Sequence, residues 1–201
     1  MARPSEFDRD EAIAKAIKVF ARHGFEAAST NDLIEGMGIG RQSLYGAFGD
    51  KRRLFLEALQ RYSADSLAQM NSALAAGSAA ESIEAALLVG LGSSDDVESG
   101  CLGVGSIVEF SRSDPEVNVL NDRASQMVIA AFAARVRDAI AAREFDVDLD
   151  SDAVGRMLLV LRSGLKVAAR GGAGQTELRD TALLALRGLL RERGGRRGGS
   201  R

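Results

Sequence analysis

Residues 29–59 have the sequence STNDLIEGMGIGRQSLYGAFGDKRRLFLEAL, and this stretch decides the fold. Ser29 lies three positions before Asp32, which is a variant of the capping-box spacing that begins a helix. The helix that it begins is short and ends at glycines, and Ile39 places one apolar residue in the turn that follows. A second short helix is expected over Arg41–Phe48. Two short helices joined by a tight, glycine-containing turn predict a helix-turn-helix unit.

The helices on either side of this unit are predicted by the spacing of apolar residues. A first helix is expected over Phe7–His23, and Gly24 lies where the end of a helix needs a left-handed residue. Asp50 is expected to cap a long helix that starts at Lys51. The apolar stripe of the first helix consists of Ile13, Ala16, Ile17 and Phe20. An ordinary three-helix bundle is the alternative interpretation of the same pattern.

The remaining sequence also has helical periodicity. We expect the fourth helix to continue to residue 76, with further helices over residues 80–91, 101–112, 115–143, 151–170 and 176–193. The sequence therefore predicts an all-α protein of about nine helices. We divide it into a helix-turn-helix domain over residues 1–56, a larger helical domain over residues 57–193, and a Gly/Arg-rich tail over residues 194–201 that we expect to be disordered.

Composition excludes several classes of protein. Apolar residues make up 46% of the 201 residues and charged residues 27%, which is ordinary for a globular chain. The single cysteine, Cys101, excludes an intrachain disulfide, and the single histidine, His23, argues against a histidine zinc site or a catalytic triad. We expect no cofactor and no metal. The sequence predicts neither a signal peptide nor a membrane span, so a cytoplasmic location is expected.

The charge is unevenly distributed along the chain. The net charge is only −2, but residues 39–53 contain four basic residues and one acidic residue. Residues 80–160 contain fifteen acidic and six basic residues. DNA binding depends on the electrostatic field of one face of a protein, so the overall balance does not exclude a nucleic-acid partner.

The start of the second short helix contains the residues expected to reach DNA bases. A helix fits the major groove, where side chains near its N-terminus contact base edges. Arg41 and Gln42 can each form two hydrogen bonds with a base, to guanine and adenine respectively. Ser43 lies beside them, and Gly46, one turn on, allows close backbone approach. Contact of Arg41 with phosphate alone is the alternative.

Three further side chains are expected to contact DNA phosphates. Tyr45 projects beside the buried face of its helix, so its ring can pack while its hydroxyl reaches a phosphate. Lys51 lies at a helix N-terminus, and Thr30 offers a hydroxyl at the start of the first short helix.

The segment from Ala12 to Leu59 resembles the DNA-binding domain of the TetR family of bacterial regulators. The resemblance rests on AIKVFARHGFEAAST, DLIEGMGIGRQSLYGAFGDKRRLF and the long helix after them. It implies a transcriptional regulator, by family default a repressor, that binds double-stranded operator DNA through the residues above. Gly40 departs from the family pattern, which often has a small hydroxyl residue there. Gly46 stands where a bulky or polar residue is common, so base reading is expected to depend on the first turn of the helix.

The family resemblance also implies a homodimer built from the last two large helices. An intrachain core is the alternative use of the same apolar positions. Two recognition helices would then meet a near-palindromic operator with half-sites roughly 34–36 Å apart. The expected interface residues are Leu158, Leu161, Leu165, Leu183, Leu186 and Leu190.

By the same resemblance, the larger domain binds an unknown, largely apolar small-molecule effector that releases the DNA. Plain core packing is the alternative for every candidate pocket residue. Cys101 is also open to two interpretations, as a reactive sensor thiol or as a small packed residue. The candidate pocket residues are Cys101, Val104, Val108, Phe110, Met127, Phe132 and Met157.

Two rival functions follow from other features of the sequence. Residues 100–105, GCLGVG, superficially resemble a phosphate-binding loop, which would suggest an enzyme. They follow no predicted strand and lack the lysine of a P-loop, so we do not expect an enzyme. An architectural or partner-binding protein with no effector is the second rival.

Overall fold

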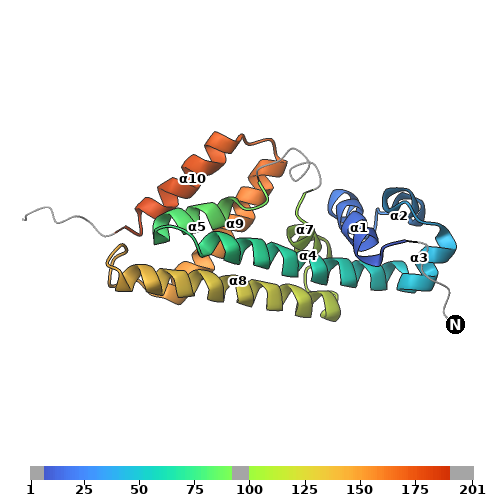
Figure 1. Cartoon of the computed structure of the whole chain (residues 1–201), viewed down its shortest axis with the longest axis horizontal. Helices are drawn as coiled ribbons and strands as arrows, with labels where there is room; N and C mark the ends of the chain where they lie inside the picture. Colours follow the sequence, from blue (N-terminus) through green and yellow to red (C-terminus); the bar gives the residue numbers. More distant parts are fainter. Residues whose placement is uncertain (1–6, 92–99, 191–201) are drawn as a thin grey trace, which may run out of the picture.

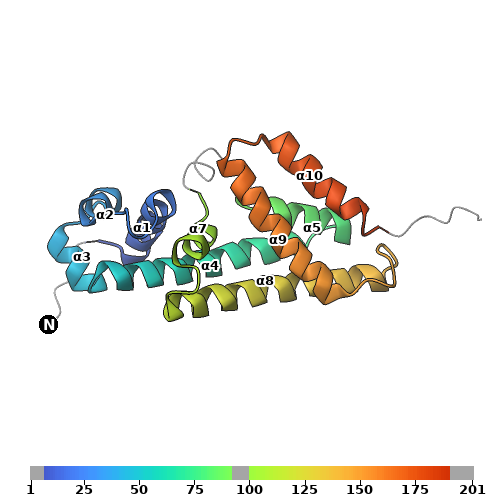
Figure 2. The ribbon, with the colours of Figure 1, turned by 180° about the vertical axis from the view of Figure 1, so that it is seen from behind.

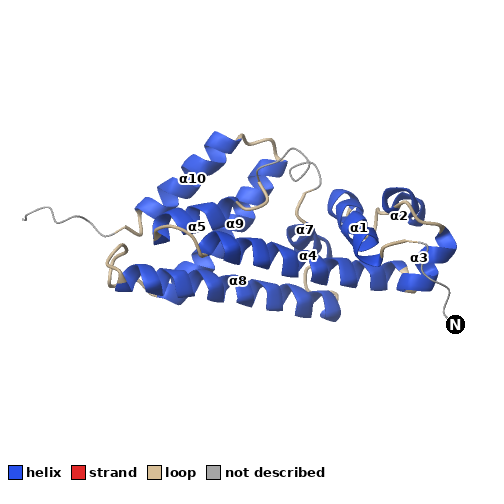
Figure 3. Cartoon of the chain, in the orientation of Figure 1, coloured by secondary structure: helices blue, strands red, loops and turns tan. Residues whose placement is uncertain are grey.

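A computed structural model describes residues 7–91 and 100–190. Within these ranges the chain forms nine α-helices and no strand, which confirms the all-α prediction (Figure 3). The expected loop before Cys101 and the Gly/Arg-rich tail lie largely or wholly outside these residues. The helices are α1 (Arg9–His23), α2 (Thr30–Met37), α3 (Arg41–Phe48), α4 (Lys51–Leu74), α5 (Ala79–Leu88), α7 (Leu102–Phe110), α8 (Pro115–Ala141), α9 (Ser151–Arg170) and α10 (Gln175–Arg187).

The molecule is elongated along two long helices. Helices α4 and α8 run side by side, with α1, α2 and α3 gathered at one end and α5, α9 and α10 at the other (Figure 1). Helix α7 lies between the two groups, as the view from behind also shows (Figure 2). None of the helices in the described ranges has the length and apolarity needed to cross a membrane.

Two predicted helices end earlier than expected because a residue beyond the last turn has a positive φ angle. The helix expected over residues 101–112 ends at Phe110, where Ser111 adopts a positive φ of 48°. The helix expected to reach residue 143 ends at Ala141, and Arg143 has a φ of 61°. Positive φ interrupts a right-handed helix. Neither position is a glycine, which is the residue that would have predicted the interruption.

Two hydrophobic clusters form the interior. The first is built mainly by α1 to α4, but it also contains Leu102 of α7 and Val117 of α8. The second is built by the distal half of α4 together with α5, α8, α9 and α10. Helix α4 contributes to both clusters without a break, so the predicted domain boundary at residue 56 falls inside a continuous helix. That boundary remains a prediction.

Aromatic side chains join the helix-turn-helix end of the molecule to α7. The fully buried ring of Phe55 on α4 packs edge-on against Phe20 of α1, with centroids 5.1 Å apart. It also contacts Phe25, from the turn after α1, at 5.0 Å and Phe110 of α7 at 5.4 Å. The Glu109 carboxylate of α7 accepts hydrogen bonds from the backbone N–H groups of Phe25 (2.8 Å) and the next residue (2.7 Å). Helix α7 is therefore fastened directly to the turn before α2.

An ion pair joins the start of α4 to the start of α8. Arg52 bonds both carboxylate oxygens of Asp114, at 3.0 Å for the longer contact, and also bonds Glu116. Asp114 is itself the N-cap of α8 and accepts the backbone N–H groups of Glu116 and Val117. The Arg52 guanidinium, with these N–H donors, lowers the pKa of Asp114 to about 2 from an ordinary value of 3.8.

Truncation of Phe55 tests the aromatic junction. We expect Phe55→Ala to lower the free energy of unfolding by about 3–5 kcal/mol, because it removes a buried ring that three other rings contact. Urea unfolding followed by circular dichroism at 222 nm measures this. Val147→Ala is the control, because that side chain is exposed and should change stability by less than about 0.5 kcal/mol. A loss below about 1 kcal/mol for Phe55→Ala would contradict the assigned packing.

Asp114→Asn tests the ion pair while keeping a residue that caps helices well. The pKa of Asp114 is lower in the folded protein than in the unfolded chain. The stabilisation from the ionised Asp114 is therefore fully present above about pH 4 and is lost as the pH falls through about 2. We expect a loss of about 1 kcal/mol at pH 7, since Arg52 is partly solvent-screened. Urea unfolding at pH 7 and pH 3 should show a smaller difference at the lower pH. Asp122→Asn, from an exposed pair with Arg112, is the control and should change the stability less than Asp114→Asn does at pH 7.

Candidate nucleic-acid interface

The start of α2 is fixed by a reciprocal cap. The Ser29 hydroxyl accepts the backbone N–H of Asp32 at 3.1 Å, and the Asp32 carboxylate accepts the backbone N–H of Ser29 at 2.8 Å. The Ser29 hydroxyl also donates to the Asp32 carboxylate at 2.6 Å. This bond and the one from the Ser29 N–H lower the pKa of Asp32, so the carboxylate is charged near the positive end of the α2 dipole. The predicted capping box is present.

The turn between α2 and α3 has the expected shape. Gly38 is left-handed, with φ 69° and ψ 31°, and its N–H closes the end of α2 on the carbonyl of Ile34. Ile39 is buried between the helices. Gly40 is the N-cap of α3 and supplies no side-chain hydrogen bond.

Helix α3 is amphipathic in the way that DNA recognition requires. Leu44 and Phe48 are buried in the first cluster and hold the helix against α2 and α4. On the opposite side, Arg41, Gln42 and Gly46 are exposed, and Tyr45 is 43% exposed. Ser43 is half-buried beside them. The helix lies at the tip of the long axis, with this face not covered by any other described element (Figure 1).

Gly46 has room for any side chain. A Cβ atom built at this position would meet no atom within 4 Å. The glycine is therefore not required for packing inside the described chain, and it leaves a flat stretch of backbone on the exposed face of α3.

The basic side chains near α3 have defined partners. Arg41 donates to the Asn31 side-chain oxygen at 3.0 Å, which holds its guanidinium beside Thr30 and the start of α2. Asn31 was not predicted as part of the site, because neither its charge nor its position in the sequence distinguishes it from other polar residues at the start of a helix. Lys51 is half-buried, donates to the Glu26 carbonyl at 3.2 Å and lies 4.6 Å from the centre of the Phe25 ring.

The other basic residues of this region differ in availability. Arg52 is engaged by the two carboxylates at the start of α8. Arg9 lies 4.8 Å from the centre of the Phe48 ring and is paired with Glu57. Arg53 is largely exposed and lies 3.8 Å from the Asp50 carboxylate, a contact that solvent weakens. Arg41, Lys51 and Arg53 therefore contribute positive charge near α3 that is less closely paired than that of Arg9 and Arg52.

Only three of the seven candidate effector residues are brought together. Cys101, Val104 and the largely exposed Val108 line one cavity of about 320 Å³ beside α7. Phe110 belongs to the aromatic junction, and Phe132 is fully buried in the second cluster. Val108, Met127 and Met157 are exposed in the protomer. Apolar periodicity does not reveal which apolar face of a helix turns inward, and this is why the set divides.

The candidate dimer residues divide in the same manner. Leu158, Leu165 and Leu186 are buried inside the protomer, Leu161 and Leu183 are half-buried, and Leu190 is 43% exposed. The exposed apolar side chains of α9 and α10 are instead Met157, Val160, Val167 and Leu184.

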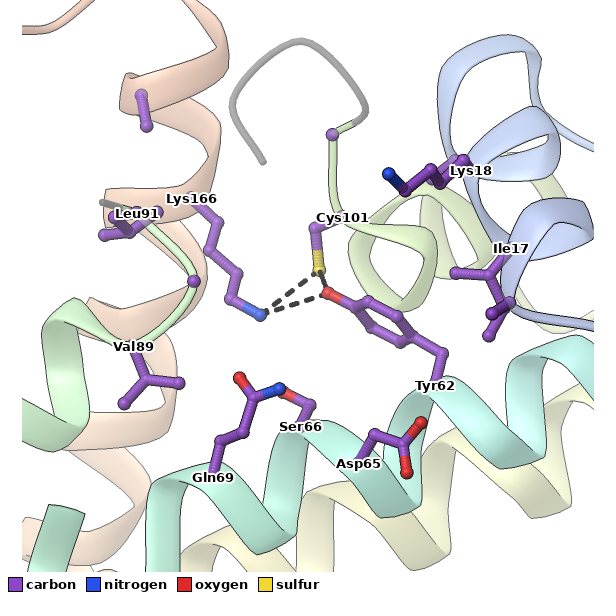
Figure 4. Close-up of a pocket in the computed structure, with 15 residues that line it drawn as sticks. Ile17, Lys18, Tyr62, Asp65, Ser66, Gln69, Val89, Leu91, Cys101 and Lys166 are labelled. Carbon is purple, nitrogen blue, oxygen red and sulfur yellow. Dashed lines mark hydrogen bonds between the residues drawn. The ribbon is translucent and has the colours of Figure 1, made fainter. Parts of the chain in front are cut away.

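A second cavity, of about 270 Å³, lies between α1, α4 and α9 (Figure 4). We call it the α1–α9 cavity, and its walls include Ile17, Lys18, Tyr62, Leu91, Cys101 and Lys166. The Tyr62 hydroxyl and the Lys166 ammonium both approach the Cys101 sulfur there. Of these three residues, only Cys101 was predicted from the sequence. The signal that could have indicated Lys166 is its place next to Leu165 of the apolar stripe of α9. No group of metal-ligating side chains is found within residues 7–91 and 100–190.

Comparison with known proteins agrees with this geometry. The family model described as "Bacterial regulatory proteins, tetR family" matches residues 12–58. The HTH-type transcriptional regulator YezE of Bacillus subtilis (strain 168) is 34% identical over 184 residues, which cover 90% of this chain and 95% of that protein. The HTH-type transcriptional repressor ComR of Escherichia coli (strain K12) is 29% identical over 92% of this chain and 90% of its own length.

A solved structure of the TetR family transcriptional regulator CifR, a cysteine mutant, was determined with 26-bp double-strand operator DNA. It is 31% identical to this chain, with a TM-score of 0.78 and coverage of 94% of this chain and 100% of that one. Similarity over nearly the whole length, together with the helix-turn-helix geometry, shows that the chain belongs to the TetR family of bacterial transcriptional regulators.

Proposed function

We propose that this regulator is a homodimeric repressor that binds a near-palindromic operator through α3 and is released by a small effector. The observation that carries the proposal is the exposed face of α3, with Arg41, Gln42 and Tyr45 at the tip of the molecule. ComR is named a repressor and CifR was solved on operator DNA, which supports both the direction of control and the partner. Such a protein acts where the chromosome is, in the bacterial cytoplasm.

Each DNA contact has a distinct role in the proposal. Arg41 and Gln42 read bases from the first turn of α3, with Ser43 and Gly46 beside them. Tyr45 and Thr30 offer hydroxyl groups to phosphates. Lys51 is anchored by its own bond to the Glu26 carbonyl, so it contacts a phosphate from a restrained position. Less conformational entropy is then lost when DNA binds.

The proposed dimer uses the exposed apolar side chains of α9 and α10. Met157, Val160 and Val167 lie on α9 at spacings that keep them on one side of the helix, and Gly164 lies between them. Leu184 adds an exposed apolar side chain from α10. An exposed apolar stripe on two neighbouring helices needs a partner, and a twofold copy of the same stripe supplies one.

Substitutions on α3 test the DNA contacts. The operator is first identified by selecting bound sequences from a random DNA pool, which should return two half-sites about one helical turn apart. We expect Arg41→Ala to weaken operator binding by about 5- to 150-fold and to relax the preference at one base position. Lys51→Met should weaken binding to all sequences and reduce the salt slope by about 1. Fluorescence anisotropy over a range of salt concentrations measures both.

Arg123→Ala is the matched control, because Arg123 is an exposed arginine on α8, a helix that has no part in the proposed DNA interface. It should leave operator affinity unchanged within about twofold. If the selection returned no enriched sequence, or if Arg41→Ala and Lys51→Met had no effect, the proposed DNA interface would be wrong.

Val160→Glu tests the dimer. Val160 is 71% exposed in the protomer, so the substitution should leave the fold intact while placing a charge in the apolar interface. We expect the molar mass measured by light scattering after gel filtration to fall from that of a dimer toward that of a monomer. Val147→Glu introduces the same charge on the exposed loop between α8 and α9 and should leave the dimer intact. A monomeric wild-type protein would refute the proposal directly.

A further inference from the structure

The sulfur of Cys101 is surrounded by hydrogen-bond donors. The Tyr62 hydroxyl donates to it at 3.1 Å, the backbone N–H of Val104 at 3.4 Å and the Lys166 ammonium at 3.6 Å (Figure 4). Lys166 also donates to the Tyr62 hydroxyl at 3.2 Å, so the three side chains form one network. A neutral thiol is a weak acceptor, whereas a thiolate accepts several donors well. The arrangement therefore suits a negatively charged sulfur.

The charges around the sulfur favour the same state. Burial on its own raises the pKa of the Cys101 thiol, but the Lys166 ammonium, the Tyr62 hydroxyl, the Val104 N–H and the Arg162 guanidinium lower it, and the net shift is downward. Arg162 is only 6% exposed and donates to the Ser66 hydroxyl at 3.0 Å. Its Nε has no hydrogen-bond partner in the described part of the chain. Burial lowers the pKa of Arg162, and the charges of Tyr62 and Cys101 oppose that shift. A thiolate at Cys101 would therefore stabilise this buried cation.

The sulfur is also accessible to a small molecule. Cys101 is only partly buried and lines the α1–α9 cavity, of about 270 Å³, as well as the neighbouring cavity of about 320 Å³ beside α7. Lys166 lines both cavities as well. Ile17 and Leu91 supply apolar walls in the first. These volumes are at or below the lower end of the range of about 300–1,000 Å³ found for ligand pockets, so they suit a small ligand.

We infer that Cys101 is a covalent sensor residue, to which small α,β-unsaturated carbonyl compounds add within the α1–α9 cavity. The thiol proton leaves to solvent, and the thiolate sulfur attacks the β-carbon and forms a C–S bond. The C=C π bond breaks, and its electron pair moves toward the carbonyl oxygen to give an enolate. The Tyr62 hydroxyl or the Lys166 ammonium, both near the sulfur, donates hydrogen bonds to that oxygen. Protonation of the α-carbon completes the addition, in which no oxidant or reductant takes part.

The adduct would act directly on the DNA-binding end of the molecule. One wall of the α1–α9 cavity is α1 itself, through Ile17, Lys18 and Ala21. Arg170 of α9 fastens the end of α1 by donating to the carbonyl groups of Ala21 at 3.3 Å and Arg22 at 3.2 Å. A molecule bonded to Cys101 occupies the space between these helices and displaces α1 from α9. This step rests on the proposed function, because it supplies the effector that the repressor requires.

Two measurements test the reaction without DNA. The full-length protein is incubated at pH 7 with N-ethylmaleimide or with crotonaldehyde, and the intact mass is followed with time. Since Cys101 is the only cysteine, a single fast adduct identifies the site. We expect Lys166→Met to slow the addition at least about threefold, because the thiolate fraction falls more steeply than the nucleophilicity of the sulfur rises. Tyr62→Phe should also slow it. Lys18→Met removes an equal charge from the same cavity and should leave the rate unchanged.

The functional arm uses the operator selected above. Crotonaldehyde should lower the operator affinity of the wild-type protein by about 5- to 150-fold, while Cys101→Ser binds DNA normally and does not respond. Cys101→Ala serves as the second variant should the serine protein be unstable. Equal addition rates for wild type, Lys166→Met and Tyr62→Phe would overturn the sensor assignment, as would an adduct that leaves affinity unchanged. Failure of the untreated protein to bind any DNA would refute the proposed function instead. The addition rates of the wild type and the variants would still test whether Cys101 is an activated thiol.

Discussion

The structure depends on the packing of Phe55 in the second turn of a continuous α4. This one ring contacts Phe20 of α1, Phe25 of the turn before α2 and Phe110 of α7. The helix-turn-helix unit is small and cannot bury a large core alone. Its hydrophobic cluster therefore includes apolar side chains from α7 and α8. As a result the DNA-binding end and the rest of the chain share a hydrophobic interior, and neither can move without repacking the aromatic junction.

Polar contacts give that junction its orientation. The Glu109 carboxylate accepts two backbone N–H groups of the turn after α1, Arg170 donates to the carbonyl groups at the end of α1, and Arg52 pairs with the cap of α8. Each contact links an element of the DNA-binding end to a different helix of the larger part. The α1–α9 cavity is lined by Ala21, whose carbonyl accepts one of the Arg170 bonds, and the neighbouring cavity beside α7 is lined by Glu109 and Arg170. An occupant of this region therefore lies next to two of the three links.

The sequence predicted the short-range features well, because caps and turns depend on neighbouring residues. The Ser29 capping box, the left-handed Gly38 and the bounds of α3 and α9 follow from local spacing. The apolar pattern predicted less well which effector and dimer candidates are buried. Met127 and Phe132 both belong to the apolar pattern of α8, but only Phe132 is buried in the core. The network of Tyr62, Cys101 and Lys166 joins residues 39 to 104 positions apart, and such distances carry no local signal.

The elongated shape separates charge as well as function. Arg41, Lys51 and Arg53 lie near one tip, whereas residues 138–152, which contain six acidic side chains and one basic one, lie at the opposite end of the molecule (Figure 1). In the field of a polyanion such a molecule experiences a torque that turns its basic tip inward and its acidic body outward. The protein therefore approaches the duplex with its basic tip first, and a larger fraction of encounters bring α3 to the DNA. Its modest net charge also limits the trapping on bulk DNA that a uniformly basic surface would cause.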